Sequence, residues 1–184
     1  MQAVILAAGK GTRLQPITNT RSKAMLPILG KPIVERIIEN LAACELRDFI
    51  LVVSPEDQAI REHFQHETTL DVHIQFVNQT RRVGMADALK QAAPYLNEDF
   101  VLSACDSLVP VEDNERLIAT WSQQPGLQAL LSLQRIPKAD SWKTGIVTLE
   151  DDRVTGIVEK PPPDQAPTNI SSTPLYCFST RILD

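Results

Sequence analysis

Short apolar runs alternate with helix-type patterns through the first 133 residues, and this alternation constrains the fold more than any other feature. The strand-like runs are residues 2–6, 48–54, 71–77, 99–104 and 127–133, and the helix-like stretches are 32–45, 55–65, 84–96 and 114–123. Helical crossovers join parallel strands, and both faces of such a sheet must be covered. We therefore predict an α/β fold, a Rossmann-like and mostly parallel twisted sheet with helices on both faces.

The pattern changes after residue 143. Residues 144–160 form two alternating runs joined at "EDD", which is typical of a β-hairpin. We expect a proline-rich loop at 161–169 and a last strand at 171–178. Ser179 is expected to cap a helix of which the sequence contains only the first residues. At 184 residues, we expect a single domain over 1–184 that carries this hairpin as an added part.

Charge is spread unevenly along the chain. The formal net charge is −5, yet no acidic residue occurs up to Val34, where Lys10, Arg13, Arg21, Lys23 and Lys31 give +5. A basic stretch at the front of an acidic chain indicates a local anion site, although a solvated basic loop remains an alternative. The overall acidity gives no general affinity for nucleic acid, so no nucleic-acid partner is expected.

The cysteines and the hydropathy pattern bear on the compartment. Cys44, Cys105 and Cys177 form no CxxC pair, which favours buried free thiols in a reducing compartment. No apolar run approaches the roughly 18 residues of a membrane helix, and no basic segment leads into a signal-peptide core. We therefore expect a cytoplasmic protein without a membrane partner.

The stretch "LAAGKGTRL" (6–14) directly follows the first strand. Leu14 stands where a dinucleotide fingerprint has its third glycine, and the P-loop pattern is absent. Gly9 and Gly11 still allow backbone N–H groups to approach an anion, while Thr12 and Arg13 add donors. The loop runs to Pro32, and loops of this length in compact domains are usually functional.

Two further polar residues follow strands. Asp106 comes after 99–104 and Gln79 after 71–77. Ligands of open α/β sheets bind beyond the carboxyl ends of the strands. The glycine loop, Gln79 and Asp106 are therefore expected at one edge of the sheet, although each alone is a weak signal: a surface amide and a turn aspartate are the ordinary readings of the latter two.

These segments together resemble the sugar-1-phosphate nucleotidyltransferases, the nucleoside-diphosphate-sugar pyrophosphorylases. The resemblance covers nearly the whole chain and rests on "LAAGKGTRLQPITNTRSKAMLP" (6–27), "NQTRRVGMADAL" (78–89), "SACDS" (103–107), "TGIV" (144–147), "VEKP" (158–161) and "TNISSTPLY" (168–176). It implies transfer of a nucleotidyl group from a nucleoside triphosphate to a sugar 1-phosphate, with release of pyrophosphate. The nucleophile is already anionic, so positioning, cations and backbone donors carry the catalysis.

The resemblance assigns roles residue by residue. Arg13, Lys23 and Asp106 are the implied catalytic residues, and Asp106 is the implied ligand of a Mg²⁺ cofactor. The implied nucleotide-binding residues are Ala7, Ala8, Gly9, Gly11, Thr12, Arg13, Gln79 and Gly84, and the implied sugar-phosphate-binding residues are Gly145, Glu159, Lys160 and Asn169. The amide of Gln79 matches the edge of uracil or thymine, which favours UTP or dTTP. We expect Asp106 to add little to folding stability, because a strand-end aspartate beside phosphates gains nothing in the empty protein.

The chain departs from the family pattern at three places. Thr144 replaces an aromatic residue and Pro174 replaces a glycine, so the identity of the sugar stays open. The family's second metal aspartate lies beyond Asp184, so we expect a nucleotidyltransferase domain truncated at its C-terminal end. Two alternatives therefore remain: a regulatory domain that only binds nucleotide or sugar phosphate, and a cytidylyltransferase acting on a non-sugar phosphate such as phosphocholine. Homo-oligomer formation also stays open.

Overall fold

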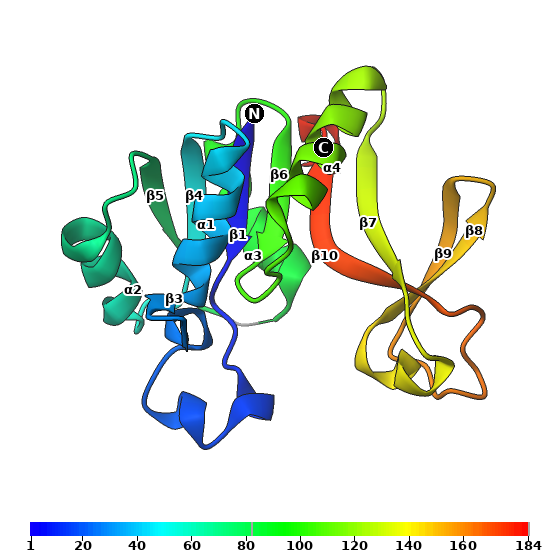
Figure 1. Ribbon diagram of the computed structural model, residues 1–184, viewed down its shortest axis with the longest axis horizontal. Helices are drawn as coiled ribbons and strands as arrows, with labels where there is room; N and C mark the ends of the chain where they lie inside the picture. The colour runs from blue at the N-terminus through cyan, green and yellow to red at the C-terminus, as the bar shows by residue number, and fades with distance from the viewer. Residues whose placement is uncertain (82, 184) are drawn as a thin grey trace. The chain divides into compact units, whose positions relative to one another are not determined.

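The computed structural model describes residues 1–81 and 83–183, which divide into two compact units (Figure 1). The first unit comprises residues Met1–Leu130 and Leu175–Asp184, and the second comprises Leu131–Pro174. The chain thus leaves the first unit once and returns to it at its end. Among the described residues, no helix has the length and apolar character needed to cross a membrane.

The first unit is built on a mostly parallel sheet. Its strands run in the order β5 (His73–Asn78), β4 (Asp48–Val53), β1 (Gln2–Leu6) and β6 (Phe100–Ala104), all parallel. The end of β10 (Ile170–Phe178) then pairs antiparallel with β6, from Leu175 to Phe178. After Gln2, the residues of β1 are all apolar because that strand is buried on both faces.

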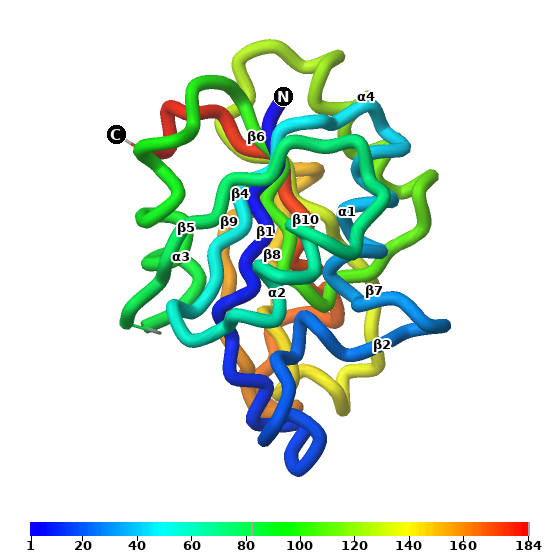
Figure 2. The backbone as a smooth tube through the Cα atoms, turned by 90° about the vertical axis from the view of Figure 1, so that its left-hand side faces the viewer, coloured from blue at the N-terminus to red at the C-terminus, as the bar shows by residue number. Residues whose placement is uncertain are grey.

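Helices cover both faces of this sheet (Figure 2). On one face, α1 (Ile33–Ala43) and α4 (Val111–Gln123) pack over the core residues that include Ile5 and Leu51. On the other face, α3 (Met85–Ala92) packs over the set that includes Val4. Successive strand residues point to opposite faces, which explains why neighbours in β1 join different clusters. The predicted fold class is confirmed.

The predicted helix 55–65 differs in detail. The Asp57 carboxylate accepts a hydrogen bond from the Ile60 N–H at 3.4 Å, so the helix begins after this cap as α2 (Gln58–Glu62). It continues as a π-helical turn, His63–Glu67. A short 3-10 turn, Ala93–Tyr95, similarly ends the α3 segment, and α4 begins three residues earlier than expected because Pro110 precedes its first turn.

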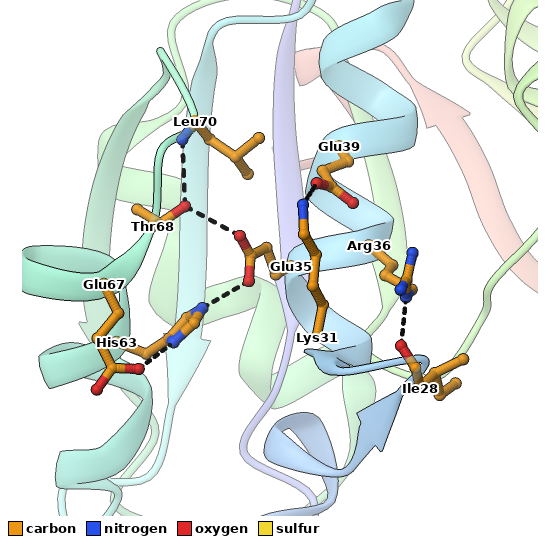
Figure 3. A network of polar contacts seen from close by, with 9 residues as sticks. All are labelled: Ile28, Lys31, Glu35, Arg36, Glu39, His63, Glu67, Thr68 and Leu70. Atoms are coloured by element: carbon orange, nitrogen blue, oxygen red, sulfur yellow. Dashed lines mark hydrogen bonds and ion pairs between the residues drawn. The ribbon is translucent and has the colours of Figure 1, made fainter.

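A buried polar network ties α1 to this π-helical turn (Figure 3). Glu35 is 4% exposed, and its Oε2 lies 2.7 Å from His63 Nε2. Its Oε1 accepts from the Thr68 hydroxyl at 3.3 Å, and His63 Nδ1 lies 2.8 Å from Glu67 Oε2. A buried carboxylate is stable only with such partners, so this network specifies how the two helical segments pack.

The basic stretch is a loop with short structured turns. It contains 3-10 turns at Thr12–Leu14, Ile17–Asn19 and Lys23–Met25, followed by the two-residue strands β2 (Pro27–Ile28) and β3 (Lys31–Pro32). Arg36 of α1 donates to the carbonyl of Ile28 at 2.6 Å, and Lys31 pairs with Glu39 (Figure 3). These contacts fasten the end of the basic loop to α1.

The second unit contains the predicted hairpin. Strands β8 (Gly145–Glu150) and β9 (Arg153–Glu159) pair antiparallel with a bulge at Thr148, and Gly145 stands opposite Glu159. A 3-10 turn at Lys138–Lys143 precedes the hairpin, and β7 (Ala129–Arg135) and β10 each lie partly in this unit. The short final helix expected after Ser179 is a 3-10 turn, Thr180–Leu183.

Candidate functional site

A cleft of about 1360 Å³ opens in the first unit at the carboxyl ends of its strands. Its walls include the ends of β1 and β6, the glycine loop and the start of α3. Ten residues were predicted to act in catalysis or nucleotide binding, and the cleft brings nine of them together: Ala8, Gly9, Gly11, Thr12, Arg13, Lys23, Gln79, Gly84 and Asp106. The tenth, Ala7, lines an adjoining hollow of about 970 Å³ that shares Ala8 and Gly9.

Gly11 fixes the shape of the glycine loop. Its φ of +62° lies in the left-handed region, which favours glycine. A Cβ at this position would also lie 3.0 Å from Thr18 Cγ2 and 3.1 Å from Lys23 Cβ. The Thr18 hydroxyl donates to the Gly11 carbonyl at 2.8 Å. Glycine is therefore required both by the turn and by the close approach of Lys23. This approach places Lys23 beside the glycine loop.

Lys23 and Asp106 form an ion pair within the cleft. Their side chains are 21% and 42% exposed, so solvent reaches both groups. Asp106 is thus paired in the empty protein, because the sheet carries it to Lys23, 83 positions away in sequence. The cleft therefore holds a cation and an anion side by side. A phosphate group there would compete for Lys23, and a metal ion would compete for Asp106.

The turn after β6 positions Asp106. The Cys105 N–H donates to the Leu6 carbonyl at 3.1 Å, which extends the β1–β6 ladder, and the Ser107 N–H donates to the Ala104 carbonyl. Burial, with a smaller contribution from the Asp106 charge, raises the pKa of the Cys105 thiol to about 12. The thiol therefore stays protonated and is a poor metal ligand.

Two acidic residues, Glu56 and Asp106, line the cleft together with the glycine loop, and Asp106 is the one predicted to bind a metal. Among the described residues, no group of three or more histidine, cysteine, aspartate or glutamate side chains is arranged to hold a metal ion. Mg²⁺ is commonly held by one or two carboxylates, with water and substrate phosphates supplying its other ligands. The carboxylate of Asp106 fits a Mg²⁺ ion that takes its remaining ligands from water and substrate phosphates.

Gln79 is held at the end of β5 by the sheet. Its N–H donates to the Val53 carbonyl at 2.9 Å, and its side chain is buried at 4% exposure. The side-chain Nε2 donates to the Gly84 carbonyl at 3.0 Å. The two residues predicted to read the base are therefore in direct contact, although one follows a strand and the other precedes α3.

Three of the four predicted sugar-phosphate residues meet in the second unit. Gly145 pairs with Glu159 across the hairpin, and a Cβ on Gly145 would lie 3.2 Å from Glu159 Oε2. Lys160 pairs with the same carboxylate, and its N–H donates to the Thr144 carbonyl at 3.1 Å. We call Gly145, Glu159 and Lys160 the hairpin site.

The backbone of Lys160 is strained. Its φ of +49° lies in the left-handed region, which is unusual for a side chain of this size. Such strain persists where the surroundings impose it, and it is concentrated at binding sites. Nearby, the fully buried Ser141 donates to the Pro161 carbonyl at 2.9 Å and helps to hold the residues that follow Lys160.

Asn169 has different partners from the hairpin site. Its Oδ1 accepts from Arg135 at 3.3 Å, and its carbonyl accepts from the Ile136 N–H at 3.0 Å. These contacts join Asn169 to the end of β7. Arg135 was not singled out from the sequence, although a cation at the end of a strand is a detectable signal for an anion-binding position.

Asp87 was also missed. It lies in the first turn of α3, and its Oδ2 accepts from Gln79 Nε2 at 2.8 Å. An acidic residue near a helix N-terminus is ordinarily explained by the helix dipole, so no local pattern connects it with Gln79. Only the contact between β5 and α3 reveals the relation.

Known proteins resemble this chain in sequence and in fold. A UTP–glucose-1-phosphate uridylyltransferase of Mycoplasma pneumoniae is 29% identical over 210 residues, covering 98% of this chain and 72% of that protein. A UTP–glucose-1-phosphate uridylyltransferase of Haloferax volcanii is 29% identical over 183 residues, covering 99% and 73%. The solved UDP-glucose pyrophosphorylase of Acinetobacter baumannii superposes with a TM-score of 0.87 at 23% identity, covering 99% of this chain and 75% of that one.

The family described as nucleotidyl transferase matches residues 2–184, which is nearly the whole chain. The match includes the glycine loop, the strand-end aspartate and the hairpin, the same segments on which the sequence motifs lie. The resemblance to the sugar-1-phosphate nucleotidyltransferases is thereby confirmed, and the chain belongs to the nucleotidyl transferase family.

Proposed function

We propose that this protein transfers a nucleotidyl group from a nucleoside triphosphate, with UTP or dTTP favoured, to a sugar 1-phosphate. A phosphate oxygen of the sugar 1-phosphate forms a bond to the α-phosphorus of the triphosphate. The bond from that phosphorus to the oxygen that bridges to the β-phosphate breaks, and pyrophosphate leaves with the electron pair. The products are an NDP-sugar and pyrophosphate, so the atoms and charges balance without a further reactant.

One observation carries this proposal: a single cleft is lined by the glycine loop, Lys23, Asp106 and Gln79. These are the parts that a bound triphosphate requires: backbone donors, a cation, a metal carboxylate and a base-reading amide. The uridylyltransferase names of two relatives that cover nearly all of this chain support the same substrates.

The basic loop and Lys23 act on the phosphates in this proposal. Gly9 and Gly11 let the backbone approach the triphosphate, and Arg13 supplies a forked donor for its oxygens. Lys23 leaves Asp106 when the triphosphate enters, because the phosphates offer it a stronger anionic partner. No side chain need act as a strong base, since the attacking phosphate oxygen is already negatively charged.

Asp106 would hold Mg²⁺ together with the triphosphate oxygens once Lys23 has turned to the phosphates. When bound, Mg²⁺ supplies positive charge that neutralises the phosphates around the reacting phosphorus. The position of Asp106 at a strand end supports this role, as does its exposed side chain. Ala7 and Ala8 are proposed to contact the ribose and base through their backbone.

The hairpin site is proposed to bind the sugar 1-phosphate. Glu159 would accept hydrogen bonds from sugar hydroxyls, while Lys160 would bind the phosphate, with Gly145 and Asn169 completing the pocket. Thr144 stands where the family usually has an aromatic residue. Its hydroxyl lies 3.0 Å from the Ser171 hydroxyl, so it anchors β10 instead of offering a ring face. This departure falls in the proposed sugar pocket and leaves the identity of the sugar open. We propose a cytoplasmic site of action because the described cysteines are free thiols.

A coupled pyrophosphate-release assay tests the proposed function. The four ribonucleoside triphosphates and dTTP are each combined with a panel of sugar 1-phosphates and phosphocholine, in the presence of Mg²⁺. We expect release with UTP or dTTP and at least one sugar 1-phosphate. Release only with CTP and phosphocholine would establish the cytidylyltransferase alternative. Nucleotide binding without release from any pair would establish the regulatory alternative, and a preference for ATP or GTP would overturn the base choice.

A further inference from the structure

The amide of Gln79 is oriented by two acceptors. Its Nε2 donates to the Gly84 carbonyl at 3.0 Å and to Asp87 Oδ2 at 2.8 Å. A carbonyl and a carboxylate oxygen accept hydrogen bonds and do not donate them, so the NH₂ end of the amide must face both. Within the described part of the chain, these contacts use both amide hydrogens. Gln79 lines the cleft, so Oε1 is the atom of this amide that remains for a ligand there.

Both acceptors are themselves fixed. Gly84 has φ +119° and ψ 179°, a conformation essentially restricted to glycine, and its carbonyl also accepts from the Ala88 N–H at 3.2 Å. Asp87 lies on the first turn of α3, which packs on the sheet through Ala88 and Ala92. The amide is therefore held by the N-terminal end of α3, which packs on the sheet.

An amide locked in this way distinguishes pyrimidines by their N3 atom. The Oε1 acceptor pairs with the N3–H of uracil or thymine. Cytosine has an unprotonated N3, which is itself an acceptor, so the two would face each other without a hydrogen between them. A buried acceptor left without a donor costs free energy, so a fixed Oε1 selects against cytosine.

We propose that Asp87 is the positioning residue that sets this selection. Without its carboxylate, the amide keeps only the Gly84 carbonyl as an orienting acceptor. Gln79 then rotates to present NH₂ to cytosine at the loss of a single hydrogen bond. The inference rests on the proposed function, because it assumes that the base of a pyrimidine nucleotide occupies this part of the cleft.

The simpler role of Asp87 is to stabilise the α3 N-terminus with its charge. Substitution by asparagine separates the two roles. Asp87→Asn removes the charge as completely as Asp87→Ala does, but it keeps a side-chain oxygen that accepts from Gln79 Nε2. A dipole role predicts that both variants behave alike, whereas the positioning role predicts that only alanine alters the choice of base.

The experiment measures equilibrium binding of UTP and CTP with Mg²⁺ by isothermal titration, with a thermal melt for each variant to establish folding. The ratio of CTP to UTP dissociation constants should fall by about tenfold in Asp87→Ala, the equivalent of one hydrogen bond, and stay within about twofold of the parent in Asp87→Asn. Gln91→Ala, an exposed change on the same helix, should leave the ratio unchanged.

Three outcomes decide the matter. A lowered ratio in Asp87→Ala alone supports the positioning role. An unchanged ratio in Asp87→Ala, or an equal fall in both Asp87 variants, overturns it while the proposed function stands. A parent protein that binds CTP as tightly as UTP overturns the proposed base preference itself, independently of either variant.

Discussion

The cleft of the first unit and the hairpin site of the second hold their charged side chains in different ways. The cleft draws its residues from segments far apart in sequence, which the parallel sheet brings to one edge, and buried strands fix their backbones. The hairpin site is formed by one antiparallel pair, and Glu159 and Lys160 are 66% and 49% exposed. The first site depends on the global fold, whereas the second depends on a local turn under strain.

Removal of the Lys23 charge should have the largest effect of any change in the cleft. Lys23→Ala takes away a cation that neutralises the reacting phosphates, so turnover should fall by about 10²–10³-fold while nucleotide affinity falls less. Lys31→Ala is the matched control, because it belongs to the same basic stretch but pairs with Glu39. Steady-state kinetics of both variants gives the comparison. Near-parental turnover of Lys23→Ala would place the chemistry elsewhere.

The free energy of unfolding should respond differently to a substitution in each of the two units. Among the described residues, His63→Ala leaves the buried Glu35 carboxylate with the Thr68 hydroxyl as its one partner, so the free energy of unfolding should fall by about 3 kcal/mol. Glu159→Gln breaks an exposed pair and should cost less than about 1 kcal/mol.

Urea denaturation followed by circular dichroism measures the loss in both variants. In a Trp142→Phe background, the fluorescence of Trp121 of α4 also reports on the first unit. Its position against the sheet core makes it sensitive to loss of packing there. Equal losses in the two variants would show that the Glu35 network is no more important to the fold than a surface ion pair.

Asp106→Asn should mainly affect the metal. In the parent, Mg²⁺ is expected to strengthen UTP binding, and the variant should lose about tenfold of that gain because the metal loses its protein anion. The unfolding free energy should change by less than about 1 kcal/mol, since the pair with Lys23 is exposed to solvent.

Asp113→Asn is a matched control for this substitution. Asp113 is also 42% exposed and also forms an ion pair, with Arg116, but it lies on α4. UTP titrations with and without Mg²⁺ compare the two variants. An intact Mg²⁺ effect in Asp106→Asn would reduce Asp106 to a turn residue.

The smallest expected effect is alkaline destabilisation of the first unit. Burial raises the pKa of the Cys105 thiol from 9.0 to about 12, so its contribution to stability is complete below pH 9 and is lost as the pH rises toward 12. Cys105→Ala should therefore reduce the loss of stability between pH 8 and 10 by about 1 kcal/mol. Urea titrations at both pH values measure this loss. An unchanged loss would mean that this thiol titrates normally in the folded protein.

The two sites also differ in how far the sequence predicts them. The alternation of strands and helices predicted the sheet, and strand-end positions predicted that Gln79 and Asp106 lie at one edge, because parallel topology makes the carboxyl ends meet. The pairing of Lys23 with Asp106 was not predictable, since it depends on how Gly11 folds the loop back onto the sheet.

Other features depend on contacts without a local pattern. The Glu35–His63 pair joins residues 28 positions apart, and neither residue is unusual on its own helix. From the sequence, Asp87 is likewise an ordinary acidic residue in the first turn of a helix. Its bond to Gln79 is seen once α3 packs beside β5. The hairpin was predictable from its alternating runs. The left-handed backbone of Lys160 was not, because lysine rarely adopts this conformation and no sequence pattern indicates it.

The division of the two substrates between the two units is the central claim, and Lys160→Ala tests it most directly. Isothermal titration measures UTP affinity, and steady-state kinetics measures the KM for the preferred sugar 1-phosphate. The account predicts a KM raised by about 10- to 100-fold, as expected for loss of a charged contact to phosphate, with UTP affinity within about twofold of the parent. A matching loss of UTP affinity, or an unchanged KM for the sugar 1-phosphate, would contradict it.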